Sequence, residues 1–216
     1  MEFFHLITAL LKQEATFDLM RLGVLYMHLI ACCVAVGLVL TSDFAMVRQL
    51  LQGNDSAHCE RAHLESLQRT ISLALLVLWI TGAAIILLDL SVKGLTYLQN
   101  PKLQAKVLIV SLLTFNGVLL HRVVMPAMVR AGTLLGLESG VRTLAVFTGT
   151  VSAVSWFYAA LLGVGRPLAW KYSLAELMLA YPLLIIGGYL AMQLLIGLAH
   201  KRSKTAASAT TLPDQQ

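Results

Sequence analysis

The chain has 216 residues, of which 58% are hydrophobic and 12% are charged, and its mean hydropathy is +0.78. Soluble domains carry about 25% charged residues, so this composition leaves too little polar surface for a globule in water, and it also excludes a disordered chain or a disulfide scaffold. The net charge of +5 suits loops on anionic lipid and requires no nucleic acid. We therefore expect an integral membrane protein whose main partner is the lipid bilayer.

Five apolar stretches are long enough to cross a bilayer as helices. They cover about residues 22–42, 71–90, 105–128, 144–165 and 175–198. In the third stretch His121 and Arg122 interrupt the apolar run, and we expect Lys106 and Arg122 to extend their charged ends towards opposite interfaces. No segment alternates like a barrel strand, and unpaired backbone groups cannot face lipid. The sequence thus predicts an all-α, polytopic bundle of five transmembrane helices.

Polar segments and charged residues flank this membrane domain, which covers residues 16–200. Residues 1–15 have apolar residues at helical spacing, so we expect a short amphipathic helix in the membrane interface. Residues 201–216 are polar and rich in small residues, and we expect a disordered tail. Asp43 and Asp89 lie at the ends of spans, where we expect water to reach them.

The distribution of basic residues suggests an orientation. Five spans place the two termini on opposite sides of the membrane. Of the 16 lysine and arginine residues, nine fall on the C-terminal side and seven on the N-terminal side. This excess favours a cytoplasmic C-terminus in a bacterial inner membrane.

Two pairs of short segments indicate an internal duplication. They are residues 64–70 (LESLQRT) with 137–143 (LESGVRT), and residues 45–48 with 127–130 (both AMVR). Each pair occupies equivalent places relative to the spans. One interpretation is a parallel repeat of two helix hairpins about an axis along the membrane normal, and the other is a chance match.

A polar stripe on the third span ends in a histidine and two methionines. Its members, three or four positions apart, are Ser111, Thr114, Gly117, His121, Met125 and Met128. Such a stripe faces the bundle interior rather than lipid. Imidazole and thioether groups suit Cu(I) or an axial position of haem, and Arg122 is placed to pair with an anionic group such as a haem propionate. The alternative is a hydrogen-bonding packing seam.

His28 lies near the middle of the first span, where an ionisable side chain is costly and is therefore a functional candidate. Ala31 and Ala35 follow at helical spacing and form a small-residue face. Such a face admits either a flat macrocycle or another helix. The alternative for His28 itself is a neutral imidazole that bonds a neighbouring helix.

Three further histidines are expected on the same membrane face as His121, namely His58, His63 and His200. Counted along the spans, His28 and His121 differ in depth by roughly 8–20 Å, whereas two axial ligands of one haem must lie at nearly one level. His121 with His63 or His200 is therefore the better-placed pair of ligands.

Several short motifs follow one another along residues 20–130. They are His28, then Thr81-Gly82, then the run Tyr97-Leu98-x-Asn100-Pro101-x-x-x-x-Lys106, and then Asn116 with His121. In this order the chain resembles a group of small bacterial helical membrane proteins. The group includes the protoporphyrinogen-oxidase type of haem synthesis, the CopD-like copper-resistance membrane domain, and predicted membrane families of four-helix cytochrome-b style.

The resemblance implies haem or copper handling through histidines inside the membrane. Carried over by position, His28 matches the histidine of the first span, Lys106 the lysine that opens the third span, and His121 the histidine that closes it. The chain departs from the oxidase type at Cys32 and Asp43, near which that type has a tryptophan and an Arg-Leu pair.

We expect a haem b-binding redox protein, acting in electron transfer or porphyrin oxidation, with a redox partner or a second copy of the chain as partner. The expected cofactor-binding residues are His121, His28, Arg122, His63, His200 and Lys106. One alternative is a copper-handling membrane protein that uses His121, Met125 and Met128. The other is a non-catalytic scaffold or accessory subunit.

Overall fold

The computed structural model describes residues 14–52, 61–165, 168 and 170–210, and their side chains except those of 14, 15, 52, 61–64 and 200–210. All regular elements in these ranges are helical. They are α2 (Glu14–Gln52), α3 (Arg61–Lys93), η1 (Leu95–Gln99), α4 (Pro101–Leu119), η2 (Leu120–Val124), α5 (Met125–Ala131), α6 (Ser139–Val164) and α7 (Leu174–Thr210). The interfacial helix expected over residues 1–15 lies almost entirely outside the described part.

Five helical segments are long and apolar enough to cross a membrane. They are Thr16–Leu51, Glu65–Lys93, Pro101–Ala131, Ser139–Val164 and Leu174–Ala199. The expected all-α bundle of five transmembrane helices is therefore confirmed, and the chain is an integral membrane protein. Its helices begin before the predicted spans and, except for the fourth, which ends at Val164, also end after them, because hydropathy marks only the part of a helix that crosses hydrocarbon.

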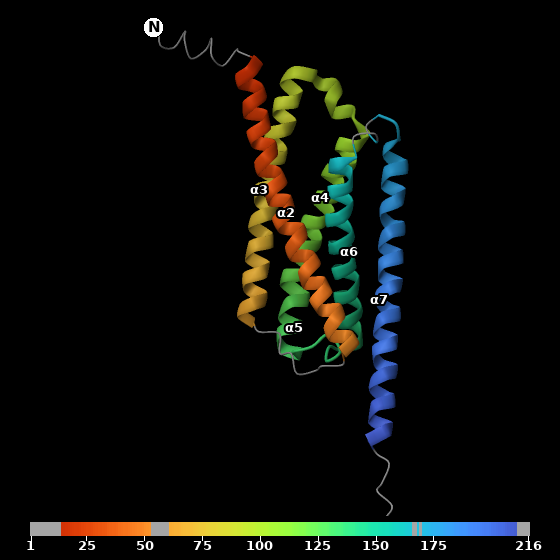
Figure 1. The fold of residues 1–216 in the computed structure, drawn as a ribbon. Helices are drawn as coiled ribbons and strands as arrows, with labels where there is room; N and C mark the ends of the chain where they lie inside the picture. The colour runs from red at the N-terminus through yellow and green to blue at the C-terminus, as the bar shows by residue number, and fades with distance from the viewer. Residues whose placement is uncertain (1–13, 53–60, 166–167, 169, 211–216) are drawn as a thin grey trace, which may run out of the picture.

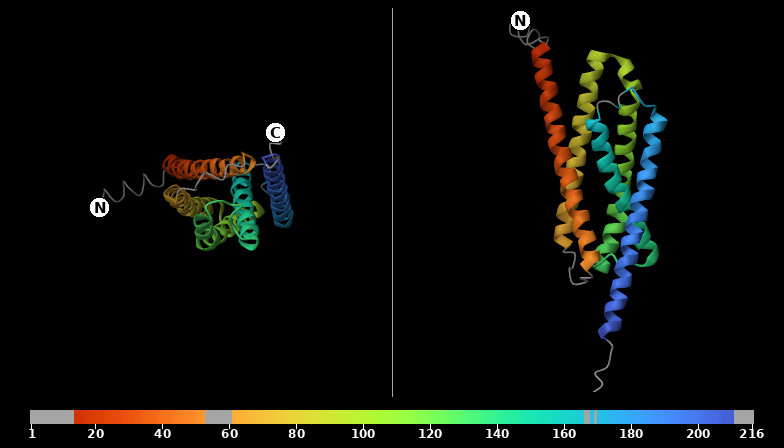
Figure 2. Two further views of the ribbon diagram at one scale, coloured as in Figure 1. Left: turned by 90° about the horizontal axis from the view of Figure 1, so that it is seen from below. Right: turned by 45° about the vertical axis from the view of Figure 1, so that its right-hand side comes forward.

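The helices run alternately up and down, so that α2 begins and α7 ends at opposite ends of the bundle (Figure 1). α2 and α3 form an antiparallel hairpin, while α4 packs on α6 and α6 on α7. α2 is tilted across the bundle, and its second half reaches α6 and α7. Seen along the bundle axis, α3 and α7 lie on opposite sides (Figure 2).

The last helix is longer than the sequence indicated. α7 continues to Thr210, so residues 201–210, where a disordered tail was expected, are helical. Alanine, lysine and arginine are good helix formers, and this stretch contains neither glycine nor proline. Its polarity therefore does not prevent it from extending the apolar helix before it.

The third span is one continuous helical segment with a turn of π-helix in it, η2. Pro126 explains this irregularity, because proline has no backbone N–H and its ring clashes with the carbonyl four residues earlier. The chain accommodates Pro126 by a wider turn, in which the backbone N–H of Met125 bonds the carbonyl of Leu120. Turns of this kind often occur at functional sites, and this one contains His121 and Arg122.

The run that resembles other membrane families forms the start of α4. The Oδ1 atom of Asn100 accepts a hydrogen bond from the backbone N–H of Lys102 at 3.0 Å, which caps the helix. Pro101 follows at the first helical position, where its missing N–H costs nothing. The Asn-Pro pair therefore has a structural role at this position.

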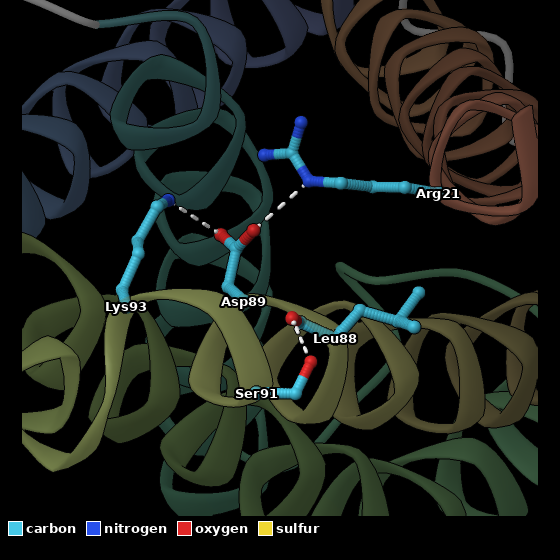
Figure 3. A network of polar contacts seen from close by, with 5 residues as sticks. All are labelled: Arg21, Leu88, Asp89, Ser91 and Lys93. Atoms are coloured by element: carbon cyan, nitrogen blue, oxygen red, sulfur yellow. Dashed lines mark hydrogen bonds and ion pairs between the residues drawn. The ribbon is translucent and has the colours of Figure 1, made fainter. Parts of the chain in front are cut away.

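A buried carboxylate joins the first two spans at the end of the bundle where α2 begins (Figure 3). Asp89 accepts from the Nε of Arg21 at 2.9 Å and from the Nζ of Lys93 at 3.0 Å. Its side chain is only 7% exposed, whereas those of Arg21 and Lys93 are 43% and 49% exposed. The expectation that water reaches Asp89 is therefore wrong, because two long cationic side chains cover the carboxylate.

Tyr97 of η1 completes this ion-pair network. Its hydroxyl interacts with the Asp89 carboxylate, and the Nζ of Lys93 lies 4.7 Å from the centre of its ring. Burial, followed by the hydrogen bond to Asp89, raises the pKa of Tyr97 to about 12. The phenol therefore stays protonated and donates to the carboxylate.

The two LES-containing segments of the suggested duplication make the same local contact. Thr70 Oγ1 donates to the carbonyl of Ser66 at 3.0 Å, and Thr143 Oγ1 donates to that of Ser139 at 2.9 Å. Threonine makes such bonds in many helices. The parallel repeat of two hairpins therefore stays a prediction.

We expect Asp89→Asn to lower the free energy of unfolding by about 1–3 kcal/mol, because it weakens two charge-assisted hydrogen bonds between α2 and α3. Thermal unfolding in detergent, followed by circular dichroism, measures the loss. Asp18→Asn is the matched control, because Asp18 is exposed on α2. Equal loss in both variants would contradict a clamping role for Asp89.

Candidate functional site

A partly open hollow of about 430 Å³, here called the internal cavity, lies between the membrane helices, in the half of the bundle where α2 ends. Its wall is mostly apolar and receives side chains from α2, α3, the α4–η2–α5 segment, α6 and α7. Among the described residues, its ionisable lining groups are Asp43 and His121. The cavity is therefore an apolar hollow with one carboxyl and one imidazole in its wall.

The π-turn presents Leu120, His121 and Val124 to this cavity, and His121 is the ionisable one of the three. Its Nε2 atom lies 3.2 Å from the Oγ atom of Ser72 on α3. Its Nδ1 atom is buried and has no hydrogen-bond partner among the described residues. Most buried polar atoms are paired, so this unpaired nitrogen is an exception that requires an explanation.

Four of the eight methionines line the internal cavity. Met125 and Met128 are the two that the stripe on the third span predicted beside His121, and their role as ligands stays a prediction. The other two, Met46 of α2 and Met192 of α7, were not predicted by the sequence pattern. Residues on separate helices show no common spacing, so only the fold reveals that they meet.

The rest of the stripe divides between interior and lipid. Gly117 lines the cavity, and Thr114 accepts a hydrogen bond from the Nε1 of Trp79 on α3 at 3.0 Å. Ser111 is exposed instead, contrary to the expected interior position. Its hydroxyl donates to the carbonyl of Val107 at 2.8 Å, so it needs no partner from another helix.

Arg122 does not lie in this site. Its side chain is exposed and lines neither hollow, because neighbouring residues of a helix point in different directions. Arg130, two turns further along, lies in a second hollow of about 330 Å³ at the end of the bundle. Glu65, Gln68, His121 and Met125 also line this end pocket.

His28 of α2 makes its polar contact with the other half of α3, away from the internal cavity. Its Nδ1 atom lies 2.8 Å from the Oγ1 of Thr81, whose single hydrogen is donated to the carbonyl of Val77 at 2.6 Å. The imidazole must therefore donate from Nδ1 and keep its Nε2 as an acceptor. The charge of Lys106 on α4 acts on both His28 and Cys32. His28, Cys32 and Lys106 thus lie near one another, and the structure does not bring His28 or Lys106 to the internal cavity.

The small-residue face beside His28 receives a helix rather than a macrocycle. Ala31 and Ala35 are both buried, and Ala35 packs with Ala74 of α3, Leu113 of α4 and Trp156 of α6. Small side chains let the backbones of α2 and its neighbours come close together.

The two intramembrane histidines lie at different depths. Their partners on α3, Ser72 and Thr81, are nine positions apart, which corresponds to about 13 Å along a helix. One haem cannot take both imidazoles as axial ligands across this distance.

The proposed second ligands His63 and His200 have backbone positions in α3 and α7, and their side chains lie outside the described part. The described residues contain no group of three histidine, cysteine or acidic side chains that could hold a metal ion. This finding does not address methionine ligands.

Comparison of the chain with protein-family models, curated proteins and solved structures gives no match. The resemblance to haem- and copper-handling membrane proteins therefore stays an expectation from the sequence. The fold and the cavity define a class: a multi-pass membrane protein with an apolar internal cavity and a histidine in its wall.

The cavity wall contains a close approach of two helices that can be tested. A Cβ atom on Gly188 of α7 would lie 2.9 Å from the Cγ2 of Thr150 on α6, whose hydroxyl is held by the carbonyl of Val146. We expect Gly188→Ala to lower the free energy of unfolding by about 1–3 kcal/mol through overpacking. Thermal unfolding in detergent measures this.

Gly187→Ala is the matched control, because a Cβ atom at Gly187 meets nothing within 4 Å. Alanine favours a helix over glycine by about 1 kcal/mol, so this variant should be as stable as the original or more stable. Equal stability of Gly188→Ala and Gly187→Ala would contradict a close approach of α6 and α7 at Gly188.

Proposed function

We propose that this membrane protein binds haem b in the internal cavity, with His121 as a ligand of the iron. The observation that carries the proposal is the Nδ1 atom of His121, which is buried in the cavity wall without a partner. An unpaired buried polar atom costs about 1–3 kcal/mol. A metal ion satisfies such an atom, since neutral imidazole is a common metal ligand.

The surroundings of His121 fit a metal-binding imidazole. A histidine that binds a metal usually has its other ring nitrogen held by a second group, which fixes the orientation of the ring. The Ser72 hydroxyl holds the Nε2 of His121 in this way, and Nδ1 is the ring nitrogen without a partner among the described residues.

The size and polarity of the cavity also support a large apolar cofactor. Its volume of about 430 Å³ falls within the range of about 300–1,000 Å³ that is common for cofactor sites. Its walls are mostly apolar and suit the face of a macrocycle. Arg130 in the adjoining end pocket, rather than Arg122, is then the cationic group that would pair with an anionic group of the cofactor.

A second ligand on the opposite face of the haem would come from another helix. Met125 and Met128 follow His121 on the same helical segment, and neighbouring side chains of one helix cannot approach an iron from opposite sides. Met46 of α2 and Met192 of α7 line other parts of the wall. A histidine–methionine pair in this cavity would therefore use Met46 or Met192.

Each part of the site would have a definite task in this protein. A bound haem with such ligands supplies one-electron transfer. His121 would bind the iron, Ser72 would hold the imidazole in one orientation, and the apolar wall would exclude water.

The methionines favour a second candidate, a copper-handling membrane protein. Thioether and imidazole groups are soft ligands that suit Cu(I). Met46, Met128 and Met192 pack against one cluster of buried residues, and His121 lines the same cavity. Copper would use His121 together with methionines from α2, α5 and α7.

We expect detergent-purified protein to show a Soret band and a reducible α-band. His121→Ala should abolish both bands, while His28→Ala, the matched control, should keep them, because His28 of α2 contacts α3 at another depth. Circular dichroism and size-exclusion chromatography check that both variants fold.

Other outcomes separate the candidates. Loss of the bands in His28→Ala alone would assign the haem to the other half of the bundle. Copper in a sample without a Soret band, lost in His121→Ala, would favour the copper-handling candidate. A sample with neither cofactor would leave the scaffold or accessory-subunit interpretation.

A further inference from the structure

The internal cavity and the end pocket share part of their walls. Gln68 of α3, His121 of η2 and Met125 of α5 line both hollows. The two hollows therefore adjoin each other at these three residues.

The end pocket lies where the membrane meets water. Glu65 and Arg130 line it and are both exposed, one near the start of α3 and the other in the last turn of α5. Charged side chains without burial belong in water or among lipid headgroups rather than in hydrocarbon. The pocket therefore opens on the side of the membrane where α2 ends, which is also the side of the C-terminus.

The side chains of the shared wall are held by few interactions. His121 is held by one bond of 3.2 Å to Ser72, and Gln68 makes no hydrogen bond to any described residue. Met125 has three rotatable bonds, and methionine adapts readily to different packing. The π-turn and Pro126 also interrupt the regular hydrogen bonds of the helix that carries His121 and Met125.

We propose that the end pocket is the aqueous entrance of the internal cavity, and that Gln68, His121 and Met125 form the gate between them. The ligand that fits both hollows is amphipathic, with an apolar body in the cavity and a polar end between Glu65 and Arg130. This inference goes beyond the haem proposal, because it holds for any amphipathic occupant.

Thiol labelling tests the entrance without any cofactor. The native cysteines Cys32, Cys33 and Cys59 are replaced by serine, and Gly149→Cys then places one thiol in the cavity wall. A Cβ atom at Gly149 meets nothing within 4 Å, so the wall tolerates it. A membrane-impermeant methanethiosulfonate is added to sealed vesicles in which either the C-terminal or the N-terminal side of the protein faces outward. A tag at the C-terminus shows which side faces outward.

We expect the reagent to modify Gly149→Cys from the C-terminal side and not from the other side. His121→Ala should raise this rate several-fold, because it removes the largest polar side chain of the gate. Val129→Cys lines the end pocket outside the gate, so it should react from the same side at a rate that His121→Ala leaves unchanged.

Two further variants keep the test decisive. Gly117→Cys is a second cavity reporter on α4, which also has open space around its Cβ atom. Gly163→Cys on α6 is exposed, has the same open space and lines neither hollow, so the reagent should not reach it from the C-terminal side.

The entrance would be refuted by equal labelling of both cavity reporters from the N-terminal side. Unreactive reporters beside a reactive Val129→Cys would also refute it, as would rates that do not respond to His121→Ala. Any bound haem is extracted from the vesicles before the reagent is added, so the outcome of this measurement is independent of the spectrum.

Discussion

The polar contacts of α3 are the constraint on which the rest of the bundle depends. Inside a bilayer, polar groups must find partners within the protein, because lipid offers none. α3 provides Asp89 for Arg21 and Thr81 for His28 on α2, Trp79 for Thr114 on α4, and Ser72 for His121 on η2. These contacts fix its position against both α2 and the third span.

The internal cavity is a consequence of how α3 is held. α3 packs closely against α2 and η1, while it meets the third span through Trp79 and Ser72 rather than through a continuous helix interface. The space that remains between the helices around Ser72 is the internal cavity, and His121 lines it. The π-turn that Pro126 causes places this imidazole in the wall with one nitrogen unpaired.

Part of the site was predictable from one helix. The spacing of Gly117, His121 and Met125 predicted a shared face, and all three line the cavity. The same pattern was wrong for Ser111, because a serine that bonds its own backbone has no need of the interior. Nothing in the pattern indicated Met46 or Met192, which lie on other helices and contribute half of the methionines in the wall.

The sequence by itself determined the membrane class, the five helices and their alternating directions, because these depend on the length and apolarity of segments and on backbone hydrogen bonding. The helical start at Asn100-Pro101 and the irregular turn before Pro126 are local effects, but the apolar spacing did not predict them. The spans had also predicted that His28 and His121 lie at different depths. Only the tertiary structure decided that Asp89 is buried under Arg21 and Lys93, and that Thr81 and Ser72 are the partners of the two histidines. These depend on which residues of different helices meet, and helical spacing carries no information about the partner helix.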